Sequence, residues 1–183
     1  MPDRMRIANL VLGGAMVGLL ATIHAASPTA GGAHGAAAET SLFEHLAGRW
    51  VLHGTIDGKA TTHDVDATFV LNRGYIQLHE TSREKDATGA PAYEAFVTIG
   101  IDKQTGEYTC LWLDNTNSVG LSAAGIARGL PTATSIPFLF KVGRGAFHTT
   151  FVYAPANDTW QWLMDDESSG RREPFARVTL TKR

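Results

Sequence analysis

The sequence contains a single cysteine, Cys110, among its 183 residues. An internal disulfide is therefore excluded, because such a bond needs two cysteines. Cys110 lies in a segment of alternating apolar residues and is followed closely by Trp112. This setting favours a buried, unreactive thiol. We expect the fold to be stabilised by the packing of its core alone.

Short catalytic motifs are also missing. The chain contains no G-x-S-x-G, no H-E-x-x-H, no glycine-rich phosphate loop after a strand and no paired cysteines. These absences argue against serine hydrolases, zinc proteases and nucleotide-binding enzymes. The formal net charge is −2 and no block of basic residues occurs, which argues against nucleic acid and against an anionic membrane surface as partners.

The start of the chain has the composition of a secretory signal. Arg4 and Arg6 precede an apolar run over residues 7–23, and small residues follow. We expect cleavage after Ala25 or Ala26; the alternative, a retained membrane anchor, is disfavoured because the run is short and interrupted. The sequence thus predicts an exported protein, periplasmic or secreted, that has no membrane attachment after cleavage. Its expected parts are a signal peptide (1–26), a disordered Ala/Gly-rich leader (27–40) and one folded domain (41–183).

The clearest pattern in the folded part lies between residues 93 and 114. Two runs in which apolar and polar residues alternate are joined by a short connector that ends in Gly106. A period of two is what a strand with one buried face requires. Glycine can adopt the left-handed conformation that closes a short hairpin. The segment therefore predicts a β-hairpin.

The same alternation recurs along the chain with hairpin-length connections. Besides the two strands of that hairpin, we predict strands at 49–57, 63–72, 75–83, 134–142, 146–154, 159–166 and 175–182, and a weak one within 118–129. A short helix is predicted at 41–48. Nine or ten short strands without an interior helix indicate an all-β, up-and-down antiparallel barrel. A two-sheet sandwich is the alternative.

Gly48-Arg49-Trp50 resembles the Gly-x-Trp signature of lipocalins and the wider calycin superfamily, because it follows a short helix and opens the first strand. Together with LNRGYIQL and IGIDKQTGEYTCLWLD, it also resembles a bacterial family of secreted, lipocalin-like barrels of unknown function. The resemblance covers 42–183 and implies a lipocalin-like barrel. It further implies that Trp50 closes the barrel against an arginine of the last strand, for which Arg177 is the matching candidate and Arg183 the alternative.

Strand alternation also predicts which side chains line the interior. These are Phe69, Tyr93, Val97, Phe151 and Trp162. A lining that is apolar with one phenol suits a lipid, an isoprenoid or an aromatic metabolite better than a sugar or a nucleotide. We therefore expect an exported binding barrel for a small, mostly apolar molecule, with no metal and no cofactor. A barrel filled by its own side chains would instead have a structural or partner-binding role.

Two histidines carry the remaining alternatives. If Ile76 and Leu78 point inward, His79 is a surface residue; if Tyr75 and Gln77 do, His79 lines the cavity as a candidate acid or base of a barrel enzyme. His148 raises the possibility of haem binding, because the nitrobindin-like barrels use one axial histidine. The aromatic face of its strand is the better candidate for the interior, which places His148 outside.

The acidic run at 165–167 ends a strand. Adjacent strand residues point to opposite faces, so Asp165 and Asp166 are not placed to share a metal ion. We expect solvated acids near a turn.

Overall fold

The computed structural model describes residues 42–116 and 121–183. The predicted signal peptide and leader lie outside these residues. Within the described part, no helix is long and apolar enough to cross a membrane.

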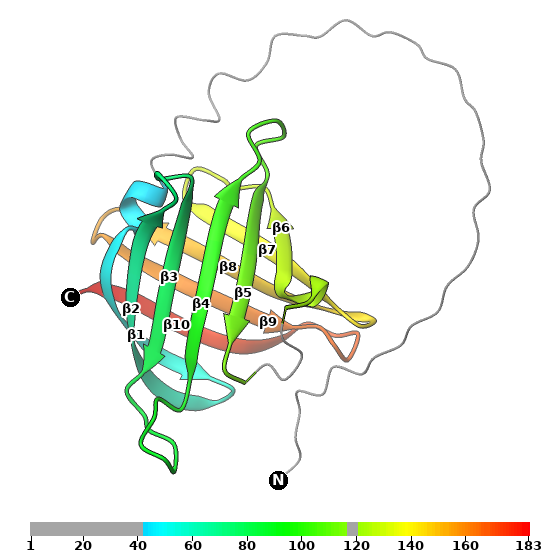
Figure 1. Ribbon diagram of the computed structural model, residues 1–183. Coiled ribbons are helices and arrows are strands. Elements are labelled where there is room, and N and C mark those ends of the chain that lie inside the picture. Colours follow the sequence, from blue (N-terminus) through cyan, green and yellow to red (C-terminus); the bar gives the residue numbers. More distant parts are fainter. Residues whose placement is uncertain (1–41, 117–120) are drawn as a thin grey trace, which may run out of the picture.

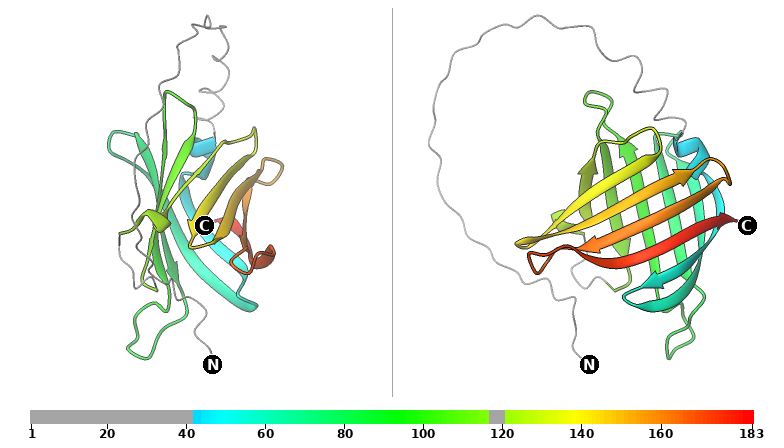
Figure 2. Two further views of the ribbon diagram at one scale, coloured as in Figure 1. Left: turned by 90° about the vertical axis from the view of Figure 1, so that its right-hand side faces the viewer. Right: turned by 180° about the vertical axis from the view of Figure 1, so that it is seen from behind.

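Ten antiparallel strands form one closed barrel (Figure 1). They are β1 (Gly48–Ile56), β2 (Lys59–Val70), β3 (Tyr75–Ser82), β4 (Glu94–Ile101), β5 (Tyr108–Asp114), β6 (Ile126–Gly129), β7 (Ser135–Val142), β8 (Gly145–Ala154), β9 (Thr159–Asp166) and β10 (Glu173–Lys182). Each strand pairs with its neighbours in the chain, and β1 pairs with β10 to close the ring. The predicted up-and-down barrel is confirmed and the sandwich is excluded. In Figure 2, strands β2–β5 form one wall and β7–β10 the wall that faces it.

The predicted hairpin is present as β4 and β5. Gly106 has a φ of +72°, and its N–H donates to the carbonyl of Asp102 at 2.7 Å. The weak segment 118–129 contains one turn of 3₁₀ helix, η1 (Ala123–Gly125), followed by the four-residue β6. Its many small residues offer little side chain for a longer strand to pack.

A short helical segment lies at one end of the barrel, which we call the helix end. Residues 42–46 are helical, and Leu42, Phe43 and Leu46 are buried. Trp50 is fully buried and donates its indole N–H to the carbonyl of Leu46 at 2.8 Å. The helix thus covers the interior here, and the opposite end, where β3 finishes and β4 begins, is called the far end.

The arginine expected to close the barrel lies elsewhere. Trp50 is opposite Lys182 in the β1–β10 register, and the Lys182 ammonium lies 5.4 Å from the centroid of the Trp50 ring. Arg177 is opposite Thr55 instead. Because Ala176 and Val178 are buried, strand alternation turns Arg177 to the outer face. Arg183 donates its backbone N–H to the carbonyl of Arg49 at 3.0 Å, and its guanidinium lies 3.5 Å from Asp64 rather than against Trp50.

Arg177 binds Asp165, which corrects the prediction of solvated acids at 165–167. Asp165 is buried and accepts hydrogen bonds from Arg177 and, at 2.8 Å, from Arg172. Burial raises the pKa of Asp165, but the bonds from the two guanidinium groups outweigh it, so the pKa lies below its ordinary value. The outer face of β9 and β10 thus carries a three-residue ion cluster.

This cluster should make stability depend on pH in the acid range. A lowered folded-state pKa stabilises the fold fully above the unfolded value, about 3.9 for Asp. The contribution disappears as the pH falls through the folded value. We expect Asp165→Asn to be less stable than the wild type at pH 7, by a margin that shrinks below about pH 4. Urea unfolding of both proteins from pH 7 to pH 2 measures this margin, and a margin independent of pH would contradict the assignment.

Candidate binding site at the far end of the barrel

Two ionisable side chains point into the barrel near its far end. In β3, Ile76 and Leu78 are buried, and the same alternation turns Glu80 inward. In β2, buried Val65 brings His63 to the inner face. The β2–β3 register sets His63 opposite Ser82 and Val65 opposite Glu80. His63 and Glu80 are therefore diagonal neighbours on one face, within reach of each other.

His63 and Glu80 form a buried pair. Their side chains are only 4% and 1% exposed, and His63 Nδ1 is hydrogen-bonded to Glu80 Oε1. The other carboxylate oxygen, Glu80 Oε2, is buried and has no hydrogen-bond partner among residues 42–116 and 121–183. A buried polar atom without a partner is costly, since it loses its water and gains nothing in return. This oxygen is therefore able to accept a hydrogen bond from a further group.

The hydrogen bonds around His63 fix one of its protons. Thr61 donates its hydroxyl hydrogen to Glu84 Oε2 at 3.1 Å, and Thr61 Oγ1 lies 2.8 Å from His63 Nε2. A hydroxyl has one hydrogen, so Nε2 must donate to Thr61. A single further proton then lies between Nδ1 and Glu80 Oε1. The pair is neutral overall, whichever of these two atoms holds that proton.

Glu84 keeps its charge in this arrangement. Burial raises the pKa of its carboxyl, but hydrogen bonds from its own backbone N–H, from Thr62 and from Thr61 outweigh that effect. The pKa of Glu84 is therefore below its ordinary value. Glu84 accepts hydrogen bonds at neutral pH, as the direction of the Thr61 bond requires.

Tyr93 completes the polar side of the site. Its ring stacks on His63 with centroids 5.6 Å apart, and its hydroxyl oxygen accepts the indole N–H of Trp112 at 3.1 Å. Burial raises the pKa of Tyr93 well above its ordinary value, and the carboxylates of Glu80 and Asp114 raise it further. The hydroxyl therefore stays protonated. No described residue accepts its hydrogen.

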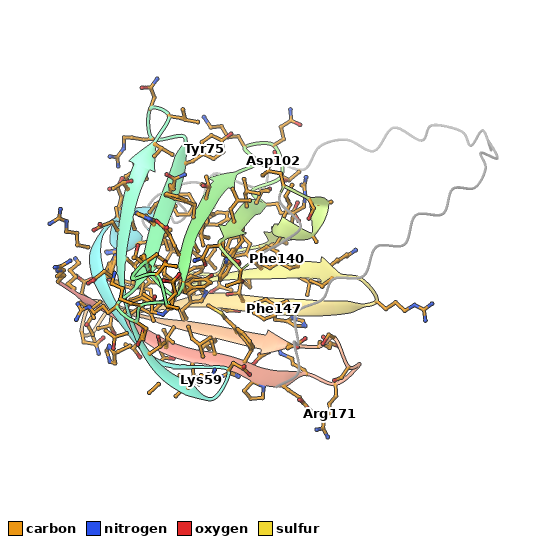
Figure 3. The ribbon with its side chains drawn as sticks, turned by 60° about the horizontal axis from the view of Figure 1, so that its bottom comes forward. Lys59, Tyr75, Asp102, Phe140, Phe147 and Arg171 are labelled. Atoms are coloured by element: carbon orange, nitrogen blue, oxygen red, sulfur yellow. The ribbon has the colours of Figure 1, made fainter. Side chains whose placement is uncertain are left out.

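Trp112 connects this polar cluster to an apolar side. Its ring lies 5.3 Å from that of Trp162 and 6.1 Å, edge-on, from that of Phe140. Partly buried apolar residues pack against the core near the far-end termini of β1, β7, β8 and β10: Ile56, Val142, Phe147 and Phe175. Figure 3, in which the far end comes forward, shows Phe140 and Phe147 on β7 and β8. The far end thus has a polar half on β2–β5 and an apolar half beside it.

Four of the five predicted lining residues lie in one interior: Val97, Phe151 and Trp162 belong to the buried core, and Phe69 packs against it. Val97, Phe151 and Trp162 have no exposed surface; Phe151 and Trp162 stack at 4.3 Å, and the Trp162 N–H donates to Thr149 at 2.6 Å. Phe69 lies towards the helix end, with the Arg73 guanidinium 3.9 Å from its ring centroid. Tyr93 belongs to the far-end cluster, and Trp162 adjoins it through Trp112, with ring centroids 5.3 Å apart.

The two histidines singled out in the sequence lie on the outer face. His79 stacks on Phe96 with centroids 4.5 Å apart, and its Nε2 lies 2.7 Å from Glu94. Its position follows from the inward direction of Ile76 and Leu78 and corresponds to the surface alternative. His148 Nε2 lies 2.6 Å from Glu167 Oε2, on the face opposite to buried Thr149 and Phe151.

Two hollows on the surface lie apart from the cluster. One of about 340 Å³ is lined by Asp166, Ser168, Ser169 and Glu173 in the β9–β10 turn. The other, of about 240 Å³, lies over β6–β8 and includes Arg128, His148 and Arg172. Each of these basic residues already faces an acidic partner. Neither hollow offers an unpaired buried group, so the far-end cluster is the better candidate site.

Comparison with known proteins adds no family assignment. The sequence matches no protein-family model and no curated protein. Among the described residues, no group of three or more His, Cys, Asp or Glu side chains is arranged to hold a metal ion.

Proposed function

We propose that this protein is an exported binding barrel that takes a small, mostly apolar molecule at its far end. The observation that carries the proposal is the unpaired, buried oxygen of Glu80. It lies in a cluster joined through Tyr93 and Trp112 to aromatic residues. Small-molecule sites combine apolar walls with a few polar groups that fix orientation, and they occur in the mouths of β-barrels.

The architecture supports this position. The helix end is covered by residues 42–46 and by fully buried Trp50. At the far end, the partly buried rings of Phe147 and Phe175 pack against the core. These two rings contact each other edge-on at 5.4 Å. An apolar molecule placed against them would remove this surface from water, which is favourable at roughly 25 cal/mol per Å².

Titration with toluene, a small apolar probe, tests the proposal. Two-dimensional NMR of the indole N–H groups reports on the four tryptophans separately. We expect the Trp112 signal to shift more than that of Trp50, which is buried at the helix end. The spectrum of the Trp112→Phe variant, in which one indole signal is missing, identifies the signal that belongs to Trp112. Mass spectrometry of compounds that co-purify with the protein provides an independent search for the natural ligand. Equal or absent shifts at Trp112 and Trp50 would refute binding at the far end.

Export is the other half of the proposal, and it rests on the arginines, apolar run and small residues at the start of the sequence. We expect N-terminal sequencing of protein recovered from outside the cytoplasm to begin at Ala26 or Ser27. A mature protein that retains Met1 to Ala25 would contradict cleavage and favour a membrane anchor.

A further inference from the structure

The proposed function leaves open which polar group the bound molecule carries. We propose that this group is a hydroxyl, so that the ligand class is small apolar alcohols and phenols. The inference rests on the proposed function and deepens it. It follows from two unmatched hydrogen-bonding atoms in the same cluster, one on Glu80 and one on Tyr93.

Glu80 supplies the unmatched acceptor. Its Oε1 is bound to His63, and its buried Oε2 has no partner. A carboxylate oxygen accepts hydrogen bonds and, without a proton, has none to give. The ligand must therefore bring a hydrogen. A ligand that carries a carboxylate brings no hydrogen and would add a negative charge beside Glu80 in a poorly hydrated site.

Tyr93 supplies the unmatched donor. Its oxygen accepts from Trp112, while its own hydrogen is accepted by no described residue. The Tyr93 ring stacks on His63, the partner of Glu80, so donor and acceptor lie around one histidine. The ligand group should therefore also carry a lone pair. An ammonium group has none.

A hydroxyl fits both requirements with nothing left over. It has one hydrogen for Glu80 Oε2 and lone pairs for the Tyr93 hydrogen. A primary amide offers both functions too, but its second N–H would be buried without an acceptor, which is costly. Alcohols and phenols are thus the chemical class that the cluster is built to hold.

A matched set of probes tests the inference: toluene, p-cresol and p-toluate, which share a ring and differ in one substituent. Dissociation constants come from the shift of the Trp112 indole N–H. For the wild-type protein we expect p-cresol to bind at least about tenfold more tightly than toluene, as expected when a buried, unpaired acceptor gains a hydrogen bond, and p-toluate to bind most weakly.

Two variants assign the effect to the cluster. In the double variant His63→Leu/Glu80→Met, which leaves no acceptor at this position, the preference for p-cresol over toluene should fall to less than about threefold. Tyr93→Phe, which removes only the hydroxyl, should also reduce the preference. Glu94→Gln, on the outer face, is the control and should keep the full preference.

The outcomes separate the two proposals. If toluene and p-cresol bind equally well, the hydroxyl assignment is overturned, because a water molecule then satisfies Glu80 and Tyr93, while the binding barrel stands. If no probe shifts Trp112, the proposed function fails and this inference fails with it. A preference for p-cresol that persists in both His63→Leu/Glu80→Met and Tyr93→Phe would also overturn the assignment.

Discussion

His63→Leu is expected to lower the free energy of unfolding by about 3–5 kcal/mol, the usual cost of removing one partner from a buried ion pair. The reason is the burial of Glu80, whose side chain is 1% exposed. Without His63, its Oε1 would join Oε2 as a buried oxygen without a partner. Chemical unfolding of the two proteins at pH 7 measures the difference.

The double variant His63→Leu/Glu80→Met provides the decisive comparison. Replacing a whole buried pair by apolar residues of similar size is often neutral or stabilising. We therefore expect the double variant to regain most of the stability that His63→Leu loses, and to lose the preference for p-cresol. Removal of the exposed pair Arg171–Glu173 should change stability far less. A double variant as unstable as His63→Leu would mean that His63 acts through packing rather than through its bond to Glu80.

Trp50→Ala should cost a similar amount, about 3–5 kcal/mol, the range measured for truncated core aromatics. Trp50 has no exposed surface, and its indole N–H holds the carbonyl of Leu46 at 2.8 Å. The substitution would open a cavity under the helical residues 42–46 and release that carbonyl. Thermal and urea unfolding measure the loss.

Trp50→Phe separates the two contributions. It keeps most of the ring volume but cannot donate to Leu46, so we expect a smaller loss of about 1–2 kcal/mol beyond any repacking. A loss below about 1 kcal/mol for Trp50→Ala would show that this residue does not close the helix end.

The strands were predictable because their alternation is local. The observed bounds of β9, Thr159–Asp166, coincide with the predicted range, and β4 and β5 lie within the hairpin predicted at 93–114. The inward direction of the Glu80 side chain was predictable from the same alternation. Starting from an inward Ile76, every second residue leads to Leu78 and then to Glu80. The alternation that turns His79 outward thus turns Glu80, the next residue, inward.

The pairing of Glu80 with His63 was not predictable, because it depends on register. A slip of one residue between β2 and β3 would turn one of the two side chains outward. The register is set by the turn after β2, where Leu71, Asn72 and Arg73 all have positive φ values. Left-handed conformations are uncommon for leucine and arginine, so composition alone does not reveal this turn. The outward direction of Arg177 was not predictable for a related reason. It depends on which alternate residues of β10 face the interior.

The connectivity of the barrel has a consequence for how the chain reaches its native state. Nine strand pairings join consecutive strands, and the tenth joins β1 to β10, the first strand to the last. Hairpins form quickly because their ends are close in sequence, whereas contacts between distant segments must overcome a larger loop-closure entropy. Ring closure should therefore be the late, slow step of folding. A chain that lacks β10 would keep a curved sheet with two bare edges, and such edges recruit other chains. Loss of the last ten residues should therefore produce aggregates rather than a smaller stable barrel.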